Sequence, residues 1–260
     1  MYKRQKLFTL ARENQDFPKL EAVKFPTIHT QEKKEAVYLN RNEFDKLLMQ
    51  IEKLGGYAVN TNLNHQDFID LPWNNRDRCN ERNFVELYDA VLVMWYFYLR
   101  AEDMPRLRNE WFEIVQEDDG EMVAKLQMEQ AKGFRGVKIS EAYRPEAVDA
   151  VRRMLNRRKE NGYFLFDWYA RPKLNPSGSQ VLDTLNTLLQ HACSQVGIQK
   201  QVIWTSLRHT AFMETLREFP ILNEVRELNI FADNAYTSAD TLRKHYLNKI
   251  DRQSSAKRAR

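Results

Sequence analysis

The chain has 260 residues, of which 43% are hydrophobic and 29% carry charge, a balance typical of a folded globular protein rather than a disordered one. No apolar run in it approaches the roughly 20 residues that a membrane-spanning helix needs. The two cysteines, Cys79 and Cys193, exclude a disulfide framework and a metal site of cysteines, and a reducing cytoplasm is the expected compartment. The net charge of +4 is only mildly basic, so nucleic-acid binding has to be judged from local clusters of charge.

The N-terminal part divides into a polar arm and a first predicted helix. Residues 1–35 are polar and interrupted by prolines, which predicts a partly extended arm. Asn40 is followed three residues later by Glu43, the spacing of a capping box at a helix N-terminus. Apolar residues then recur at helical spacing until Gly55-Gly56, where we expect the helix to end.

A long apolar helix is predicted in the next segment. Residues 57–80 lack periodicity and are expected to form a long loop, with one turn of helix at 65–69. Residues 83–99 are apolar on almost all sides, which predicts a helix buried in the centre of the domain. Arg100 follows directly, with the acidic residue Asp103 close behind. Because the helix dipole favours a cation at a helix C-terminus, Arg100 taken alone also has a purely structural interpretation.

Three short segments with alternating apolar residues predict β-strands. They are residues 111–115, 122–128 and 137–139. The segment between the second and the third contains Lys132 and Arg135 beside glycines, which predicts a basic hairpin turn. A lysine in a hairpin is usually solvated, and Lys125 and Lys138 are the alternatives for a functional lysine in this region.

A basic helix and a second long helix follow the strands. Residues 145–159 predict a helix whose C-terminal end is crowded with basic residues. These are Arg152, Arg153, Arg157, Arg158 and Lys159. We interpret the cluster either as a solvated face or as a stripe of DNA contacts. An aromatic segment at 163–168 and a helix at 179–196 complete a mainly α-helical fold with a small sheet, an α+β class.

A cationic pair, Arg208 and His209, opens an amphipathic helix. Phe212, Leu216 and Phe219 give that helix an apolar side at spacings of four and three residues. Near a helix N-terminus, the backbone N–H groups and the helix dipole favour an anion. A planar guanidinium there is suited to hold a phosphate through two parallel hydrogen bonds.

The run from Leu207 to Thr210 (Leu-Arg-His-Thr), followed by an apolar helix, resembles the second arginine motif of the tyrosine recombinase, or phage integrase, family. The segment 237–247 resembles the tyrosine motif of that family, and Arg100 after a buried helix resembles its first arginine motif. The resemblance implies a small three-stranded antiparallel sheet within a mainly helical catalytic domain. The implied domains are an arm or remnant of a DNA-clamping domain at 1–35, an integrase-like catalytic domain at 36–250, and a basic tail at 251–260.

This resemblance implies a site that cleaves and rejoins DNA. Tyr246 is the implied nucleophile, which forms a 3′-phosphotyrosyl intermediate. Arg100 and Arg208 are the implied phosphate clamp, and Lys132 is the implied acid that protonates the leaving 5′ oxygen. No metal and no cofactor is implied. Further DNA contacts are expected from His209, Arg135, Thr237, Arg152, Arg153, Arg157 and Arg158.

Two positions depart from the family pattern. The family usually has His three residues before the second arginine, where this chain has Thr205. It usually has His or Trp before the tyrosine, where this chain offers Asn234, Tyr236 or Thr237. Thr and Asn donate hydrogen bonds to phosphate oxygen, but they cannot take up a proton near neutral pH as His can. We assign Thr205 and Asn234 to the catalytic site, and Tyr236 stays open as an alternative nucleophile that leaves Tyr246 in the core.

Three functions follow from these observations. The first is a site-specific DNA recombinase or integrase, which acts on double-stranded DNA with further copies of itself in a cytoplasmic, nucleoid-associated setting. Tyr246 and the two arginines favour it. The second is a catalytically weak DNA-binding or assembly protein on the same scaffold. The two replaced histidines favour this second function, although His209 is placed to substitute in part. The third is a generic helical interaction protein.

Overall fold

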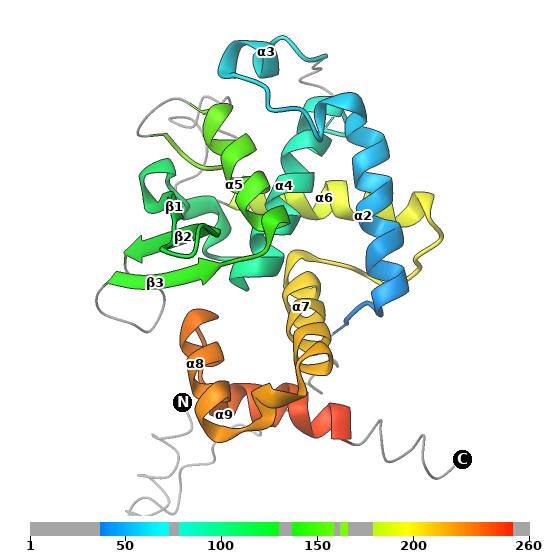
Figure 1. Ribbon diagram of the computed structural model, residues 1–260. Coiled ribbons are helices and arrows are strands. Elements are labelled where there is room, and N and C mark those ends of the chain that lie inside the picture. Colours follow the sequence, from blue (N-terminus) through cyan, green and yellow to red (C-terminus); the bar gives the residue numbers. More distant parts are fainter. Residues whose placement is uncertain (1–36, 73–77, 130–136, 159–161, 166–178, 252–260) are drawn as a thin grey trace, which may run out of the picture. The chain divides into compact units, whose positions relative to one another are not determined.

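The structure is a computed structural model, and it describes residues 37–72, 78–129, 137–158, 162–165 and 179–251. Contacts divide the chain into two units, Met1–Glu35 and Ala36–Arg260, and every described residue belongs to the second. The predicted arm, the basic hairpin turn at 130–136 and the tail beyond residue 251 lie outside the described residues. The described part is mainly helical with one three-stranded antiparallel sheet, which confirms the predicted α+β class (Figure 1). Among its helices, none has the length and apolar character that crossing a membrane requires.

The first described helix, α2 (Arg41–Gly55), begins with the predicted capping box. The backbone N–H of Glu43 donates to Asn40 Oδ1 at 2.9 Å, and the N–H of Asn40 donates to Glu43 Oε2 at 2.8 Å. Both bonds satisfy backbone groups that have no partner inside the helix. Gly56 follows with a φ of 62°, a conformation that glycine adopts without the steric penalty of a Cβ, and the helix ends there as predicted.

The loop between α2 and the next long helix is anchored by its own small apolar cluster. It contains a short 3₁₀ segment, η2 (Gly56–Ala58), and the predicted turn of helix, α3 (His65–Ile69). The cluster consists of Ala58, Val59, Leu63, Phe68, Leu71 and Val85. Because Val85 belongs to the long helix that follows, the cluster holds the loop against the core.

Helix α4 (Glu81–Phe97) is buried on nearly all sides, as its sequence predicts. It packs against α2 and against three later helices (Figure 1). These are α5 (Pro145–Asn156), α6 (Ser179–Gln195) and α7 (Trp204–Glu218). Tyr98 adopts a left-handed conformation with a φ of 52° and closes the helix. The chain therefore turns sharply just before Arg100.

The sheet contains β1 (Phe112–Gln116), β2 (Met122–Glu129) and β3 (Val137–Ala142), in that order and all antiparallel. Phe112 lies opposite Leu126, and Leu126 lies opposite Ser140. Two 3₁₀ segments, η3 (Met104–Arg106) and η4 (Asn109–Trp111), lead from α4 into β1. Helix α5 packs against β1 and β2, so the sheet lies beside the helical core.

Helix α5 ends at Asn156, before the predicted end at residue 159, and the basic residues after it turn inward. Arg157 and Arg158 are buried, and their guanidinium groups donate to Asp89 and Glu86 of α4. A buried carboxylate without a cation is strongly destabilising, so these arginines have to compensate the two acids of the central helix. The prediction of DNA contacts from Arg157 and Arg158 is therefore wrong.

The rest of the basic cluster divides between the interior and the surface. Arg153 donates to Asp89 Oδ1 at 2.6 Å, and only 12% of its side chain is exposed. DNA contact is therefore wrong for Arg153 as well, because its charge already compensates Asp89. Arg152 remains at the surface, where it pairs with Asp149 at 2.7 Å. Lys159 lies outside the described residues.

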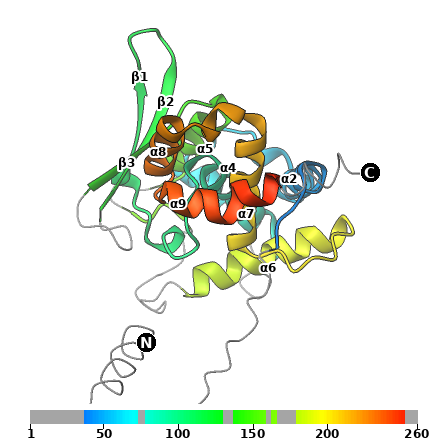
Figure 2. The same cartoon turned by 90° about the horizontal axis from the view of Figure 1, so that it is seen from below.

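The C-terminal elements assemble around the end of α7. A 3₁₀ segment, η6 (Pro220–Asn223), leads to α8 (Val225–Asn234). Helix α9 (Ala239–Leu242) continues into a π-helical turn, η7 (Arg243–Leu247). Figure 2 shows the segment containing α9 and the turn after it crossing α7, with α8 beside α9. The second arginine motif, at residues 207–210 in α7, and the tyrosine motif, at residues 237–247, therefore meet.

Candidate active site

Arg100 follows the left-handed residue Tyr98, at the point where the chain leaves α4. Its carbonyl oxygen accepts a hydrogen bond from the N–H of Asp103 at 3.0 Å, so the arginine lies in a closed turn. Its Nη2 donates to the carbonyl oxygen of Tyr236 at 2.9 Å. The end of the buried helix thereby directs this cation toward the turn between α8 and α9.

Arg208 approaches the same turn from α7. Its Nη2 donates to the carbonyl oxygen of Ala235 at 3.2 Å, and its guanidinium carbon lies 5.1 Å from the centre of the Phe212 ring. Burial and the neighbouring charge of Arg100 lower the pKa of Arg208 to about 10. Its Nε is buried and has no acceptor among the described residues. A buried donor without an acceptor costs free energy, which an added anion can recover.

The two arginines share a buried acidic neighbour, Asp103. Only 1% of its surface is exposed, and its Oδ1 has no hydrogen-bond partner among the described residues. Burial raises the pKa of Asp103, and the charges of Arg100 and Arg208 act in the opposite direction. Three arginines, Arg100, Arg106 and Arg208, act on Asp103 against one further acid, Glu102, so the local balance of charge is positive, which suits the binding of an anion.

Tyr246 lies in the π-helical turn, with 6% of its surface exposed. Its hydroxyl oxygen is 2.6 Å from Nδ1 of His209, and its ring centre is 5.0 Å from that of Phe212. Burial raises the pKa of Tyr246 to about 12, against the opposing charge of Arg208. Single π-helical turns often occur at functional sites. The phenol is thus held between His209 and Phe212, which lie three residues apart on one face of α7.

Tyr236, the alternative nucleophile, faces the sheet. It has a φ of 51°, and its hydroxyl donates to the carbonyl oxygen of Leu126 in β2 at 3.1 Å. Burial raises the pKa of this hydroxyl as well. Its backbone carbonyl oxygen accepts the hydrogen bond from Arg100. This geometry gives Tyr236 a structural role as a link between the turn and the sheet.

The two residues at the positions of the replaced family histidines have different surroundings. Asn234 accepts a hydrogen bond from the N–H of Glu141 at 2.7 Å and donates to the carbonyl oxygen of Glu141 at 3.0 Å. Both ends of its amide therefore hold α8 against β3, and the second N–H of the amide is the donor that remains for a phosphate. Thr205 lies exposed in the first turn of α7, three residues before Arg208 and on the same helix face. Thr237 is half-buried, and its N–H donates to Ala232.

The N-terminus of α7 is largely occupied by protein groups. The N–H of Trp204 donates to Asn186 Oδ1 at 2.8 Å, and that of Ser206 donates to the carbonyl oxygen of Ile203 at 2.8 Å. The expectation that free N–H groups of this terminus assist the arginine is therefore wrong for these two positions. Anion binding has to rely on the guanidinium groups themselves.

The expected lysine, Lys132, and Arg135 of the same predicted hairpin lie outside the described residues. Lys125, one of the alternatives, forms ion pairs with Glu117 at 2.8 Å and with Glu141 at 3.3 Å across the sheet. These pairs give Lys125 a role in the sheet, so Lys132 stays the predicted acid.

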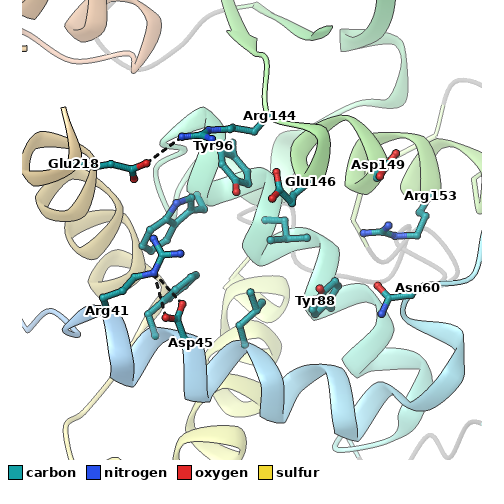
Figure 3. A pocket seen from close by; sticks show the side chains of 14 residues that line it. Arg41, Asp45, Asn60, Tyr88, Tyr96, Arg144, Glu146, Asp149, Arg153 and Glu218 are labelled. Carbon is teal, nitrogen blue, oxygen red and sulfur yellow. Dashed lines mark hydrogen bonds and ion pairs between the residues drawn. The ribbon is translucent and has the colours of Figure 1, made fainter. Parts of the chain in front are cut away.

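A cavity of about 400 Å³ lies away from the two arginines and Tyr246, between α2, α4, α5 and the end of α7 (Figure 3). Its charged residues pair with each other: Arg41 with Asp45 at 3.0 Å, and Arg144 with Glu218 at 3.1 Å (Figure 3). Its arginines are thus already neutralised, and neither predicted arginine nor Tyr246 lines it. The turn between α8 and α9, where Arg100 and Arg208 converge, is the better candidate for holding a phosphate. In the described part of the chain, no three His, Cys, Asp or Glu side chains are grouped to hold a metal ion.

The contact between His209 and Tyr246 and the bonds from Asn234 to Glu141 were not predicted from the sequence. The motifs place Arg208 and Tyr246 in one site, but they carry no signal for which side chain the phenol contacts. A histidine directly after a predicted clamp arginine is the single sequence feature that pointed in this direction.

Comparisons with known proteins give a weak likeness to solved structures alone. No model of a protein family matches the sequence, and no curated protein matches it. Among solved structures, the crystal structure of XerA recombinase is similar, with a TM-score of 0.49 and 18% sequence identity, over 92% of this chain and 71% of that chain. A likeness of this strength does not assign a function, so the function has to be inferred from the residues of the site.

Proposed function

We propose that this chain is a DNA strand-transferring protein of the tyrosine recombinase kind, in which Tyr246 attacks a phosphodiester held by Arg100 and Arg208. The observation that carries the proposal is the convergence of both guanidinium groups on the consecutive carbonyls of Ala235 and Tyr236. An arginine gains more from an anionic phosphate than from a neutral carbonyl, because the opposite charges attract and phosphate can accept two parallel bonds from one guanidinium. A phosphate can therefore take over these donors, and it supplies an acceptor for the buried Nε of Arg208.

The proposed reaction exchanges one phosphodiester bond for another. The phenolic oxygen of Tyr246 forms a bond to phosphorus, and the bond from phosphorus to the 5′ oxygen breaks. The two arginines stabilise the charge that develops on the non-bridging oxygens. Lys132 protonates the leaving 5′ oxygen, and Thr205 donates a further hydrogen bond to the phosphate. The phosphotyrosyl bond retains the energy of the broken linkage, so rejoining requires no nucleotide.

The proposed partner is double-stranded DNA, bound together with further copies of the chain. Residues 36–250 form the proposed catalytic domain, with the arm at 1–35 and the basic tail at 251–260 as additional DNA contacts. Arg135, Arg152, His209 and Thr237 remain the proposed contacts near the cleaved strand. We expect a monomer without DNA, and light scattering that shows a stable DNA-free dimer contradicts this part of the proposal.

A second function, DNA binding without cleavage on the same scaffold, has its own support. The phenol of Tyr246 is buried with a raised pKa, and the amide of Asn234 is occupied by Glu141. Both features oppose catalysis in the DNA-free protein, and neither opposes phosphate binding by the two arginines. The two functions therefore differ in one observable, the covalent bond to DNA.

Capture of the covalent intermediate tests the proposal. The protein is incubated with a pool of duplexes of randomised sequence, each carrying a nick, so that the short strand released by cleavage cannot rejoin. Protein–DNA species that survive denaturing detergent are isolated, and their DNA is sequenced to define the site. The expected result is a 3′-phosphotyrosyl peptide that contains Tyr246 and is absent from Tyr246→Phe.

Two controls separate the possible outcomes. Tyr236→Phe removes the other candidate phenol and is expected to retain the adduct. An adduct that persists in Tyr246→Phe and disappears in Tyr236→Phe moves the nucleophile to residue 236. DNA binding without any adduct, for a site selected by binding alone, supports the second function and overturns the first.

A further inference from the structure

His209 and Tyr246 form a contact that the arginine clamp does not explain. Nδ1 of His209, on α7, lies 2.6 Å from the hydroxyl oxygen of Tyr246, in the π-helical turn. The two ring centres are 5.6 Å apart, and Phe212 packs against the phenol at 5.0 Å. The histidine side chain is thus in direct contact with the oxygen atom that attacks phosphorus in the proposed reaction. Distance and packing together fix the phenol relative to one nitrogen of the imidazole.

The surroundings keep this imidazole neutral. Burial, followed by the charges of Arg208, Lys249 and His245, lowers the pKa of His209 to about 4. A neutral imidazole with its proton on Nε2 presents Nδ1 as an acceptor. The phenol, whose pKa is raised to about 12, then donates to it. Neither Lys249 nor Arg208 can replace His209 as the acceptor, because both are cationic at neutral pH.

We infer that His209 is a catalytic residue, the general base that takes the proton of Tyr246 as the phenolic oxygen attacks phosphorus. This inference rests on the proposed function. The O–H bond of Tyr246 breaks and its proton moves to Nδ1, while the new oxygen–phosphorus bond forms and the bond to the 5′ oxygen breaks. The leaving oxygen takes a proton from the general acid, proposed as Lys132. On rejoining, the imidazolium of His209 returns its proton to the phenolic oxygen.

Phosphate binding raises the basicity of His209 at the moment when the base is needed. The positive charge of Arg208 is one of the causes that lower the pKa of His209. A phosphodiester anion held by Arg208 offsets that charge and favours the imidazolium. A cavity of about 40 Å³ beside the pair is lined by Tyr38, Met213, His245 and Lys249. It has room for a water molecule, which gives the proton a route to solvent.

The substitution His209→Asn tests the inference. The asparagine amide can accept a hydrogen bond near the position of Nδ1, but it cannot take up a proton at neutral pH. With the full chain and a nicked duplex captured by the wild type, we expect His209→Asn to form the adduct about 100-fold more slowly or worse. Its melting temperature should stay close to that of the wild type, and because His209 is also a proposed DNA contact, the two rates are compared at saturating DNA. Added imidazole should accelerate adduct formation by His209→Gly, because a free base then replaces the lost one.

A modified substrate distinguishes loss of the base from loss of the acid. When sulfur replaces the 5′ bridging oxygen, the leaving thiolate needs no proton. The slow reaction of His209→Asn should therefore persist on this substrate, whereas that of Lys132→Ala should recover. Wild-type rates from His209→Asn, or recovery of this variant on the sulfur substrate, overturn the inference and leave the strand-transfer proposal intact. No adduct from the wild type overturns the strand-transfer proposal, and the inference with it.

The tautomer of His209 provides a test without DNA. Long-range proton–nitrogen spectra of the free protein should show Nε2 protonated and Nδ1 as a hydrogen-bond acceptor. The Nδ1 resonance should shift in Tyr246→Phe, which lacks the donor hydroxyl. A proton on Nδ1 in the wild type contradicts the inference directly, because that nitrogen is then unable to accept from the phenol.

Discussion

The carboxylate of Glu86, in the middle of α4, accepts a hydrogen bond from the guanidinium of Arg158, just beyond the end of α5, and both side chains are almost fully buried. The pair joins two helices through charges that neither residue can expose to water. Burial of an ion pair is tolerated when both charges stay together, and loss of one leaves the other uncompensated. The end of α5 is thereby fixed to the central helix, α4, which leads to Arg100.

The first prediction concerns this pair. Arg158→Ala should lower the free energy of unfolding by about 3–5 kcal/mol, because the carboxylate of Glu86 stays buried and loses its ion pair with Arg158. Arg152→Ala is the matched control, since Arg152 forms only an exposed pair with Asp149 and its loss should change stability by less than about 1 kcal/mol. Urea unfolding measures both values. Weaker DNA binding by Arg158→Ala at unchanged stability contradicts the structural role assigned to it.

The second prediction concerns the salt dependence of DNA binding. Each phosphate contact releases counterions, so affinity should fall steeply as salt increases. Arg208→Ala should weaken binding and reduce the slope of log affinity against log salt by about one contact's share. Arg226, exposed on α8, provides the control, and Arg226→Ala should leave the slope unchanged. Fluorescence anisotropy over a salt series gives the slopes, and equal slopes for Arg208→Ala and the wild type argue against a phosphate contact.

The third prediction compares Tyr236→Phe and Tyr246→Phe in their free energy of unfolding and in their formation of the covalent adduct. Tyr236→Phe removes the hydrogen bond to Leu126 and should lower the free energy of unfolding by about 1 kcal/mol. The variant should still form the covalent adduct, because its backbone carbonyl remains available to Arg100. Tyr246→Phe should form no adduct, and it loses a hydrogen bond as well, the one to His209. Thermal unfolding and a denaturing gel of the same samples provide the comparison.

The fourth prediction concerns the pH dependence of stability. The folded-state pKa of His209 is lowered from 6.5 to about 4, so between these values the unfolded chain binds a proton that the folded chain does not. The free energy of unfolding should therefore fall as the pH decreases from 6.5 to 4, and this contribution should be fully present above pH 6.5. His209→Asn removes the titrating group, so its stability should decline less over the same range. Urea unfolding at several pH values measures the difference, and parallel profiles contradict a buried neutral His209.

Local sequence patterns predicted most of the fold because local interactions determine those parts. The capping box of Asn40 and Glu43 involves residues three apart, and the alternation in the strands reflects one buried face. The inward turn of Arg157 and Arg158 depends on carboxylates about 70 residues earlier, on another helix. Periodicity carries no signal for such a distant pair, so a buried arginine had the same pattern as a surface one.

The candidate site shows the same division. The positions of Arg100, Arg208 and Tyr246 after or within predicted helices followed from motifs, and their roles stay predictions. The amide of Asn234, by contrast, was assigned to phosphate, and its bonds to Glu141 of β3 were not predicted. Its partner is a strand backbone that only the folded arrangement brings near. Sequence reasoning identified the charged groups of the site more readily than the neutral groups that hold its elements together.

Tyr236 links three separate segments of the chain. Its carbonyl holds the guanidinium that follows α4, its hydroxyl holds β2 at Leu126, and its own backbone forms the bend after α8. The left-handed conformation, with a φ of 51°, costs about 1–2 kcal/mol for a residue other than glycine. Glycine at this position relieves that penalty but removes the hydrogen bond to Leu126. The sheet holds the bend at two places, through the Tyr236 hydroxyl on β2 and the Asn234 amide on β3, so the rigidity of the sheet sets the rigidity of the position of Arg100.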